Sequence, residues 1–146
     1  MTLIEVRKGL NDLLSTIFPK SEYQYYGADV TEGYQRPCFF TQLQPVQMRA
    51  ENYNTYLNQV TFYINYIQEE VNEADMLKKA EAIRELFQIY VKIGDRALDV
   101  TSFEFDFTGT EKNILEISID LEWMDHIEHK TDQPIMADFF IRKKEE

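Results

Sequence analysis

The densest group of side chains that could bind a metal or move protons is the run Asp-His-Ile-Glu-His at residues 125–129. This run contains both histidines of the chain, and on a helix His126 and His129 would lie on one face and could ligate zinc. However, the spacing differs from the HExxH pattern of zinc proteases, and carboxylates would have to supply the remaining ligands. The run also follows a strand pattern directly. The sequence therefore favours a polar strand end that leads into a loop, with no bound metal or cofactor.

Cys38, the single cysteine, is the other candidate for chemistry. A cysteine nucleophile needs a nearby base, whereas Cys38 stands in an apolar run directly after Pro37, which is typical of a buried side chain. The chain has no nucleophile elbow, phosphate-binding loop or dinucleotide fingerprint, and no carboxylate pair stands out among its many acids. We therefore predict that the protein is not an enzyme, with a small metal- or carboxylate-dependent hydrolase as the less favoured alternative.

The charge of the chain narrows the classes of partner. Its 146 residues carry 15 basic and 26 acidic side chains, a net charge of −11. Nucleic-acid affinity comes from Lys and Arg that displace counterions from phosphates, so a surface this acidic repels DNA. The apolar stretches are too short for a membrane span or for the core of a signal peptide. We expect one soluble domain, made in the cytoplasm, that does not bind membranes.

Two segments have the pattern of amphipathic helices that pack on a core. Residues 3–17 follow Thr2, and Glu5 stands at the capping-box spacing from it. Residues 74–89 follow Asn72, which can cap a second helix. The solvent-facing side of the second helix is expected to carry Lys78, Lys79, Glu81, Arg84 and Glu85.

The remaining pattern is that of strands joined by turns. We expect a short strand at 23–26 and another at 37–43, which Pro45 ends, so that residues 47–54 form a loop. A long strand covers residues 56–67. The other expected strands are 90–93 and 97–100, joined as a hairpin, and 102–107 and 113–123, paired antiparallel. Together these elements predict an α+β fold, with an antiparallel or mixed β-sheet and two main α-helices packed on one face.

The last pair of strands combines a buried face with an acidic one. Apolar residues alternate with acids along both strands, so the acids must point away from the core. These acids are Glu104, Asp106, Glu116, Asp120 and Glu122. Like charges on neighbouring strands are mildly destabilising, so local stability does not explain this face. A plain solvated face is one interpretation, and a functional acidic surface is the other.

Residues 130–146 break this pattern and are predicted to form a C-terminal arm, separate from a single domain at 1–129. The arm places a short apolar cluster on a polar tether, either as a last element of the same domain or as a contact for a neighbouring subunit. The cluster consists of Ile135, Met136, Phe139, Phe140 and Ile141.

The order of the elements and four segments of the chain resemble a known family. The segments are Tyr26-Gly27, then Gly-Tyr-Gln-Arg-Pro-Cys-Phe-Phe-Thr-Gln-Leu at 33–43, the aromatic strand at 56–66, and Phe-Phe-Ile-Arg-Lys at 139–143. They are similar to the tail terminator proteins of phages and prophages of Gram-positive bacteria. The resemblance covers nearly the whole chain.

The resemblance implies a structural assembly protein, and no catalytic residue carries over from the family. Such a protein forms a homo-oligomeric ring, typically hexameric, on the last ring of tail tube protein in a virion tail or a headless phage-tail-like particle. It ends tube growth, presents a surface to the head connector and, in contractile tails, also meets the sheath protein. DNA is a partner only in transit through the lumen. Another small head–tail joining or minor tail protein is the alternative.

In such a ring, two features of the chain acquire roles. We predict that the five acidic side chains line or face the lumen, where they would keep DNA from sticking. The strand at 56–67 and the C-terminal arm are the candidates for contact with neighbouring subunits, because strand edges and arms pair readily with another chain. Assembly is expected in the cytoplasm of the host bacterium.

Overall fold

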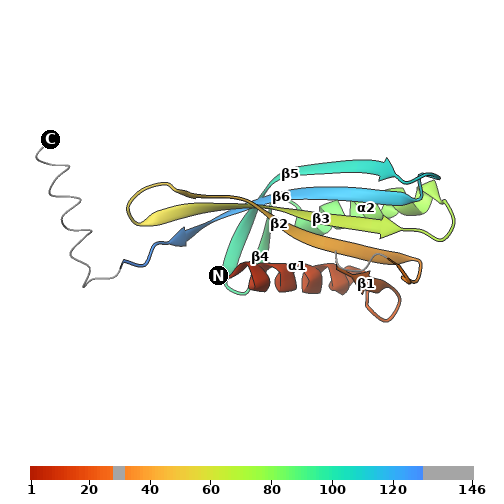
Figure 1. The fold of residues 1–146 in the computed structure, drawn as a ribbon, viewed down its shortest axis with the longest axis horizontal. Helices are drawn as coiled ribbons and strands as arrows, with labels where there is room; N and C mark the ends of the chain where they lie inside the picture. The colour runs from red at the N-terminus through yellow and green to blue at the C-terminus, as the bar shows by residue number, and fades with distance from the viewer. Residues whose placement is uncertain (28–31, 130–146) are drawn as a thin grey trace, which may run out of the picture.

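The computed structural model describes residues 1–27 and 32–129, which form one six-stranded sheet and two helices (Figure 1). The helices are α1 (Leu3–Ile17) and α2 (Glu73–Phe87), and the strands are β1 (Gln24–Tyr26), β2 (Cys38–Ala50), β3 (Thr55–Ile67), β4 (Tyr90–Ile93), β5 (Arg96–Thr108) and β6 (Ile114–His126). The strand order is β1-β2-β3-β6-β5-β4, with β1 parallel to β2 and the other neighbours antiparallel. The predicted α+β fold with a mixed sheet is confirmed.

α1 begins at the capping box that the sequence predicts. The Glu5 N–H donates to Thr2 Oγ1 over 3.1 Å, and the Thr2 N–H donates to Glu5 Oε2 over 3.1 Å. Asn72 caps α2, since its Oδ1 accepts from the Asp75 N–H at 3.2 Å. These bonds satisfy backbone donors that a helix leaves without partners in its first turn. Neither helix of the described residues has the length and apolar character needed to span a membrane.

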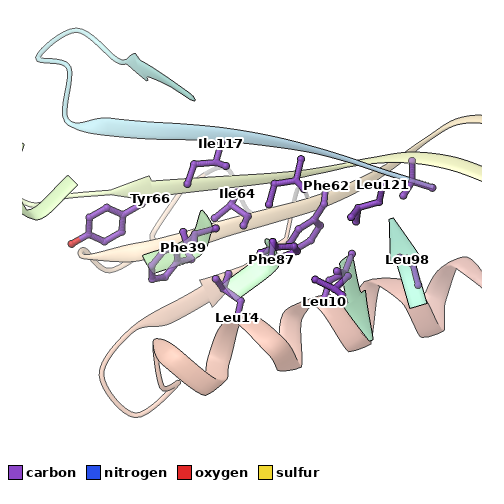
Figure 2. Close-up of a cluster of buried hydrophobic side chains, with 14 of the residues drawn as sticks. Leu10, Leu14, Phe39, Phe62, Ile64, Tyr66, Phe87, Leu98, Ile117 and Leu121 are labelled. Carbon is purple, nitrogen blue, oxygen red and sulfur yellow. The ribbon is translucent and has the colours of Figure 1, made fainter. Parts of the chain in front are cut away.

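The core lies between the helices and the side of the sheet that they cover. Figure 2 shows Leu10 and Leu14 reaching from α1 toward the sheet, from which Phe62 and Ile117 point back. All four side chains are fully buried, and they belong to one continuous apolar cluster. Burial of each side chain of this kind stabilises the fold by about 1.5–3 kcal/mol. The helices therefore hold to the sheet mainly through apolar contact.

β2 runs through Pro45, where the sequence predicted its end. The predicted loop at 47–54 is wrong in its first part, which pairs with β3. β1 pairs with β2 only as far as Phe40, so β2 is an edge strand at Pro45. Proline is tolerated there because no neighbouring strand on that side needs a backbone N–H from it. A register shift between Pro45 and Gln47 absorbs the irregularity. The β2–β3 hairpin consequently projects beyond the N-terminus of α1 (Figure 1).

Lys79 is buried, although helical spacing predicted it on the solvent side of α2. Its Nζ lies 2.9 Å from Asp75 Oδ1 and between 5.1 and 5.2 Å from the ring centroids of Phe18, Tyr23 and Tyr66. Burial by itself lowers the pKa of an ammonium group, but the contacts with Asp75 and Tyr23 outweigh it and raise the pKa of Lys79. The ammonium is therefore charged, and it lies in an aromatic cage at the rim of the core.

Two other predicted element boundaries differ from the structure, although the predicted strand pairings are present. The expected strands at 97–100 and 102–107 are one strand, β5, which passes a register shift between Val100 and Ser102. α2 ends at Phe87 and not at residue 89, because Gln88 takes a φ of 50° that interrupts the helix. The predicted hairpin of β4 with β5 and the antiparallel pairing of β5 with β6 are confirmed.

Candidate assembly surface

The five predicted acidic residues lie on one face of the sheet, opposite α1 and α2. On β6, Glu116, Asp120 and Glu122 alternate with buried apolar residues of the core. On β5, Glu104 and Asp106 alternate with phenylalanines that pair with the same core residues. Successive side chains of a strand point to opposite faces, so the acids share the face that neither α1 nor α2 covers. We call this side of β2, β3, β6 and β5, with its five acids, the bare face.

Two acids of the bare face hold hydrogen bonds across the sheet. Asp120 accepts from Thr61 Oγ1 of β3 at 2.7 Å and from Ser102 Oγ of β5 at 3.0 Å. Glu122 accepts from Gln59 Nε2 of β3 at 3.2 Å. These bonds connect three neighbouring strands through hydroxyl and amide donors. Asp120 and Glu122 therefore stabilise the sheet as well as charging it.

The other three acids, together with Ser118, surround a hollow of about 420 Å³. Asp106 lies directly opposite Glu116 in the register of β5 and β6. Within the described part of the chain, Glu104, Asp106 and Glu116 have neither a hydrogen bond nor an ion pair through their carboxylates. Like charges in register oppose the pairing of two strands. This group of acids therefore lacks a stabilising role in the isolated subunit.

The two groups of acids should respond differently to neutralisation. Glu116→Gln removes repulsion from Asp106 and should raise the free energy of unfolding by about 0.3 kcal/mol. Asp120→Asn replaces an acceptor of two hydroxyl hydrogen bonds and should lower it by about 1 kcal/mol. Urea unfolding of both variants beside the wild type measures the difference. Equal destabilisation by both substitutions would contradict the assignment of separate roles.

Asp125 ties the end of β6 to its neighbours on the opposite side of the sheet. Its Oδ2 accepts from Asn58 Nδ2 at 2.9 Å and from Trp123 Nε1 at 3.0 Å. The guanidinium of Arg96, at the start of β5, lies 2.7 Å from Asp125 Oδ1 and also donates to the Met124 carbonyl. Asp125 is the first residue of the Asp-His-Ile-Glu-His run at 125–129. Its contacts show a buried carboxylate that stabilises the fold as a hydrogen-bond acceptor.

The histidines of that run do not converge on a site. His126 is exposed at the end of β6, whereas His129 stacks on Tyr53 with ring centroids 3.8 Å apart. Within residues 1–27 and 32–129, no three side chains of His, Cys, Asp or Glu come together as they would around a metal ion. Burial raises the pKa of the Cys38 thiol to about 11, so it is protonated at neutral pH. The geometry offers neither a metal centre nor a thiolate nucleophile in this part of the chain.

The described chain ends beside the tip of the β2–β3 hairpin. The Ile127 N–H donates to the Asn54 carbonyl at 2.7 Å, and His129 Nε2 lies 2.7 Å from the carbonyl oxygen of Tyr53. The predicted arm starts at this point, and its apolar cluster lies outside the described residues. That cluster is Ile135, Met136, Phe139, Phe140 and Ile141. Large apolar side chains are also exposed on the hairpin and the adjoining end of β6, namely Val46, Met48, Tyr53 and Met124.

The strand predicted at 56–67 is not available for pairing with another subunit. β3 lies between β2 and β6 and pairs with both along its length, so that prediction is wrong. Among the strands of residues 1–27 and 32–129, the open edges belong to β2 and β5, because β1 covers only Cys38–Phe40 and β4 covers only Arg96–Asp99. A signal for the β2 edge was present in the sequence. Glutamines alternate with apolar residues on both sides of Pro45, a pattern typical of a strand that continues.

Comparison with known proteins identifies the family. The model of the family described as "Phage tail terminator protein" matches residues 5–133. One solved structure resembles the chain with a TM-score of 0.51 and 15% identity, over 89% of this chain and 99% of the other, and it supports the fold alone. Comparison with curated proteins finds no match.

The family match sets the broad role of the protein. Tail terminator proteins are structural parts of the phage tail and not typically enzymes, and their role implies contact with other tail proteins. The matched region includes α1 almost from its start and every strand of the sheet. This chain therefore belongs to the phage tail terminator protein family.

Proposed function

We propose that the protein closes the head-proximal end of a tail tube as a homo-oligomeric ring, hexameric in the simplest case. The ring ends growth of the tube protein and presents the surface to which the head connector joins. In a contractile tail, the same ring also meets the end of the sheath. We further propose that the particle is a phage, prophage or headless tail of a Gram-positive bacterium, assembled in the host cytoplasm.

The observation that carries this proposal is the separation of the two faces of the sheet. α1 and α2 cover one face, while the bare face carries carboxylates that lack a stabilising role in the isolated subunit. A ring with the bare face turned toward its axis would line the lumen with negative charge. DNA phosphates are repelled by such a wall, so DNA in transit would slide without sticking. All five acids of the bare face would belong to this wall, with Glu116 on the central strand β6 and with Glu104 and Asp106 near the edge of the subunit.

The C-terminal arm supplies a further contact in this proposal. We propose a division into a domain at 1–129 and an arm at 130–146, which begins beside the hairpin tip where the chain runs along Tyr53 and Asn54. The sequence of the arm contains an apolar cluster, namely Ile135, Met136, Phe139, Phe140 and Ile141. We propose that it binds a neighbouring subunit of the ring. Deletion of residues 135–146 should then leave a folded subunit that no longer assembles.

The test of the proposed function is binding to tail tubes of the same particle. Purified protein, added to preformed tubes, should be seen by electron microscopy as an added ring at one end only. It should also stop elongation when tube protein is supplied, at a ratio of one ring per tube. Binding along the whole tube, or elongation that continues past the bound protein, would reject the proposal. A variant with Glu116 changed to Lys should still cap tubes, because Glu116 lies on β6, inside the sheet, and the proposed lumen does not form the contact with the tube.

A further inference from the structure

The open edges of the sheet are surfaces through which two copies of the chain can bind each other. We infer that the β5 edge of one subunit pairs antiparallel with the β2 edge of the next, so that the sheet continues from subunit to subunit. This inference rests on the proposed ring, and it names the surfaces that close it. The partner is a second copy of this chain.

Both edges have backbone groups that no strand of the described residues uses. β1 ends opposite Phe40, which leaves β2 open from Thr41 onward. β4 ends opposite Asp99, and the Val100 N–H still reaches the Ile89 carbonyl at 2.9 Å, so β5 is open from Thr101 onward. An open edge is a ready template for another strand. Pro45 removes one donor from the β2 edge, so the ladder there would be interrupted at one place only.

Strand direction suits this pairing. β2, β3, β6 and β5 alternate in direction, so β5 is antiparallel to β2. A copy that continues the sheet with the same orientation therefore presents its β2 antiparallel to β5. The open stretches lie toward opposite ends of the sheet, since Asp106 is level with Phe40 through Glu116 and Asn65. The neighbour must then be staggered along the strands, as strands are when they tilt in a closed sheet.

The side chains of the two edges match on the helix-covered side. There, β5 presents Phe105 and Phe107, which are 43% and 40% exposed. β2 presents Leu43 and Pro45 on the same side, because they pair with the core residues Phe62 and Val60. Pairing of the edges would cover the two phenylalanine rings with apolar atoms. Aromatic residues on adjacent strands contribute most when a neighbour packs on them.

The edges also match on the bare face. β2 presents the amides of Gln42 and Gln44 there, whereas β5 presents the carboxylates of Glu104 and Asp106. Amide-to-carboxylate bonds across strands already occur within the subunit, between Gln59 and Glu122 at 3.2 Å. The junction would repeat this bond. It would give partners to carboxylates that have none in the isolated subunit.

Beside the β2 edge there is room and positive charge for an acidic neighbour. A hollow of about 690 Å³ is lined by residues of α1, β1 and this edge of β2. Its walls include Arg7 and Lys20 as well as Tyr25 and Leu43. In a chain with a net charge of −11, two basic side chains beside an open edge favour an acidic partner over a neutral one.

A contact of this kind is head-to-tail, because each copy uses two different edges. Such a contact closes into a ring when the rotation between copies closes, and otherwise runs on as a filament. A symmetric pairing of two β2 edges, or of two β5 edges, would stop at a dimer. The two arrangements therefore make opposite predictions for cross-linking.

The test is cross-linking between copies that carry one new cysteine each, in a Cys38→Ala background. Gln44→Cys marks the β2 edge and Asp106→Cys marks the β5 edge. A short bis-maleimide that joins diagonal neighbours on adjacent strands tolerates a small error in register. On capped tubes, a mixture of the two variants should give linked dimers, and each variant alone should give none. A chain with both cysteines should give a ladder that ends at the ring size.

The matched control replaces Asp106→Cys by Leu77→Cys, which is similarly accessible on α2 but away from the edge. This control should not link to Gln44→Cys. Links within a single variant, or no links in the mixture while tubes are still capped, would overturn the edge pairing and leave the proposed function intact. Wild-type protein that neither caps tubes nor forms rings would overturn both. As an independent measure, Phe105→Lys should abolish ring-sized species in light scattering while Leu77→Lys should not, with circular dichroism unchanged in both.

Discussion

Replacement of Asp125 by alanine is expected to lower the free energy of unfolding by about 3 kcal/mol. The Asp125 side chain is 8% exposed and accepts hydrogen bonds from Asn58 and Trp123. Its removal leaves these buried donors, and the guanidinium of Arg96, without their acceptor. Arg96 is 38% exposed, so water replaces part of what it loses and the expected cost is at the low end for a broken buried ion pair.

The measurement is urea unfolding of Asp125→Ala, followed by Trp123 fluorescence and by circular dichroism. Trp123 donates to Asp125, so its emission should also report the altered environment before unfolding. Asp99→Ala, an exposed acid on β5, is the matched control and should change stability little. If Asp125→Ala lowers the free energy of unfolding no more than Asp99→Ala does, the buried cluster around Asp125 does not stabilise the fold.

Replacement of Lys79 by alanine is the second change with a large expected effect, a loss of about 3 kcal/mol. The substitution removes the apolar stem from the core and the ammonium from its cage of Phe18, Tyr23 and Tyr66. It also leaves the carboxylate of Asp75 with only the Tyr66 hydroxyl and the Gln68 amide as side-chain donors. Lys79→Met keeps most of the stem, so the difference between the two variants separates packing from charge. Equal and small losses for both would contradict a role for the buried ammonium.

The same cluster predicts how stability depends on acid. Burial raises the pKa of the Asp75 carboxyl, but hydrogen bonds from Tyr66, Lys79 and Gln68 outweigh this and hold the pKa below its usual 3.8. A carboxyl whose pKa is lower in the folded state stabilises the fold above its unfolded pKa. That contribution is lost as pH falls through the folded value. In Lys79→Met the loss of stability between neutral pH and roughly pH 3 should therefore be smaller than in the wild type.

The features that sequence reasoning predicted are those that depend on local spacing. The capping box at Thr2 and Glu5 needs only neighbouring residues, and it is found as predicted. The alternation along β6 requires only a period of two, so the orientation of Glu116 and Asp120 could be deduced. Lys79 shows the limit of this approach. A helical period assigns a face, but it cannot show that aromatic rings from the segment after α1 and from β3 meet over that face.

The errors at the candidate surface have a common physical cause. The long apolar pattern at 56–67 identifies a strand, but not whether that strand lies at the edge or in the centre of the sheet. Pro45 was interpreted as an end because proline cannot donate to a ladder, and that rule fails where one side of the strand has no ladder. Edge positions depend on which distant strands pair. Because β6 lies between β3 and β5, β3 is a central strand and the open edges belong to β2 and β5.

The position of β6 between β3 and β5 also determines when a subunit becomes complete during synthesis. β3 leaves the ribosome early, yet its second partner follows only after α2, β4 and β5 have been made. Until β6 has been made, one edge of the apolar strand β3 is unpaired. β5 also lacks β6, the strand that joins it to β3 in the sheet. Contacts between segments so far apart in the chain form slowly compared with local ones. The sheet that separates the open edges of β2 and β5 is therefore complete only after residue 126 has emerged from the ribosome.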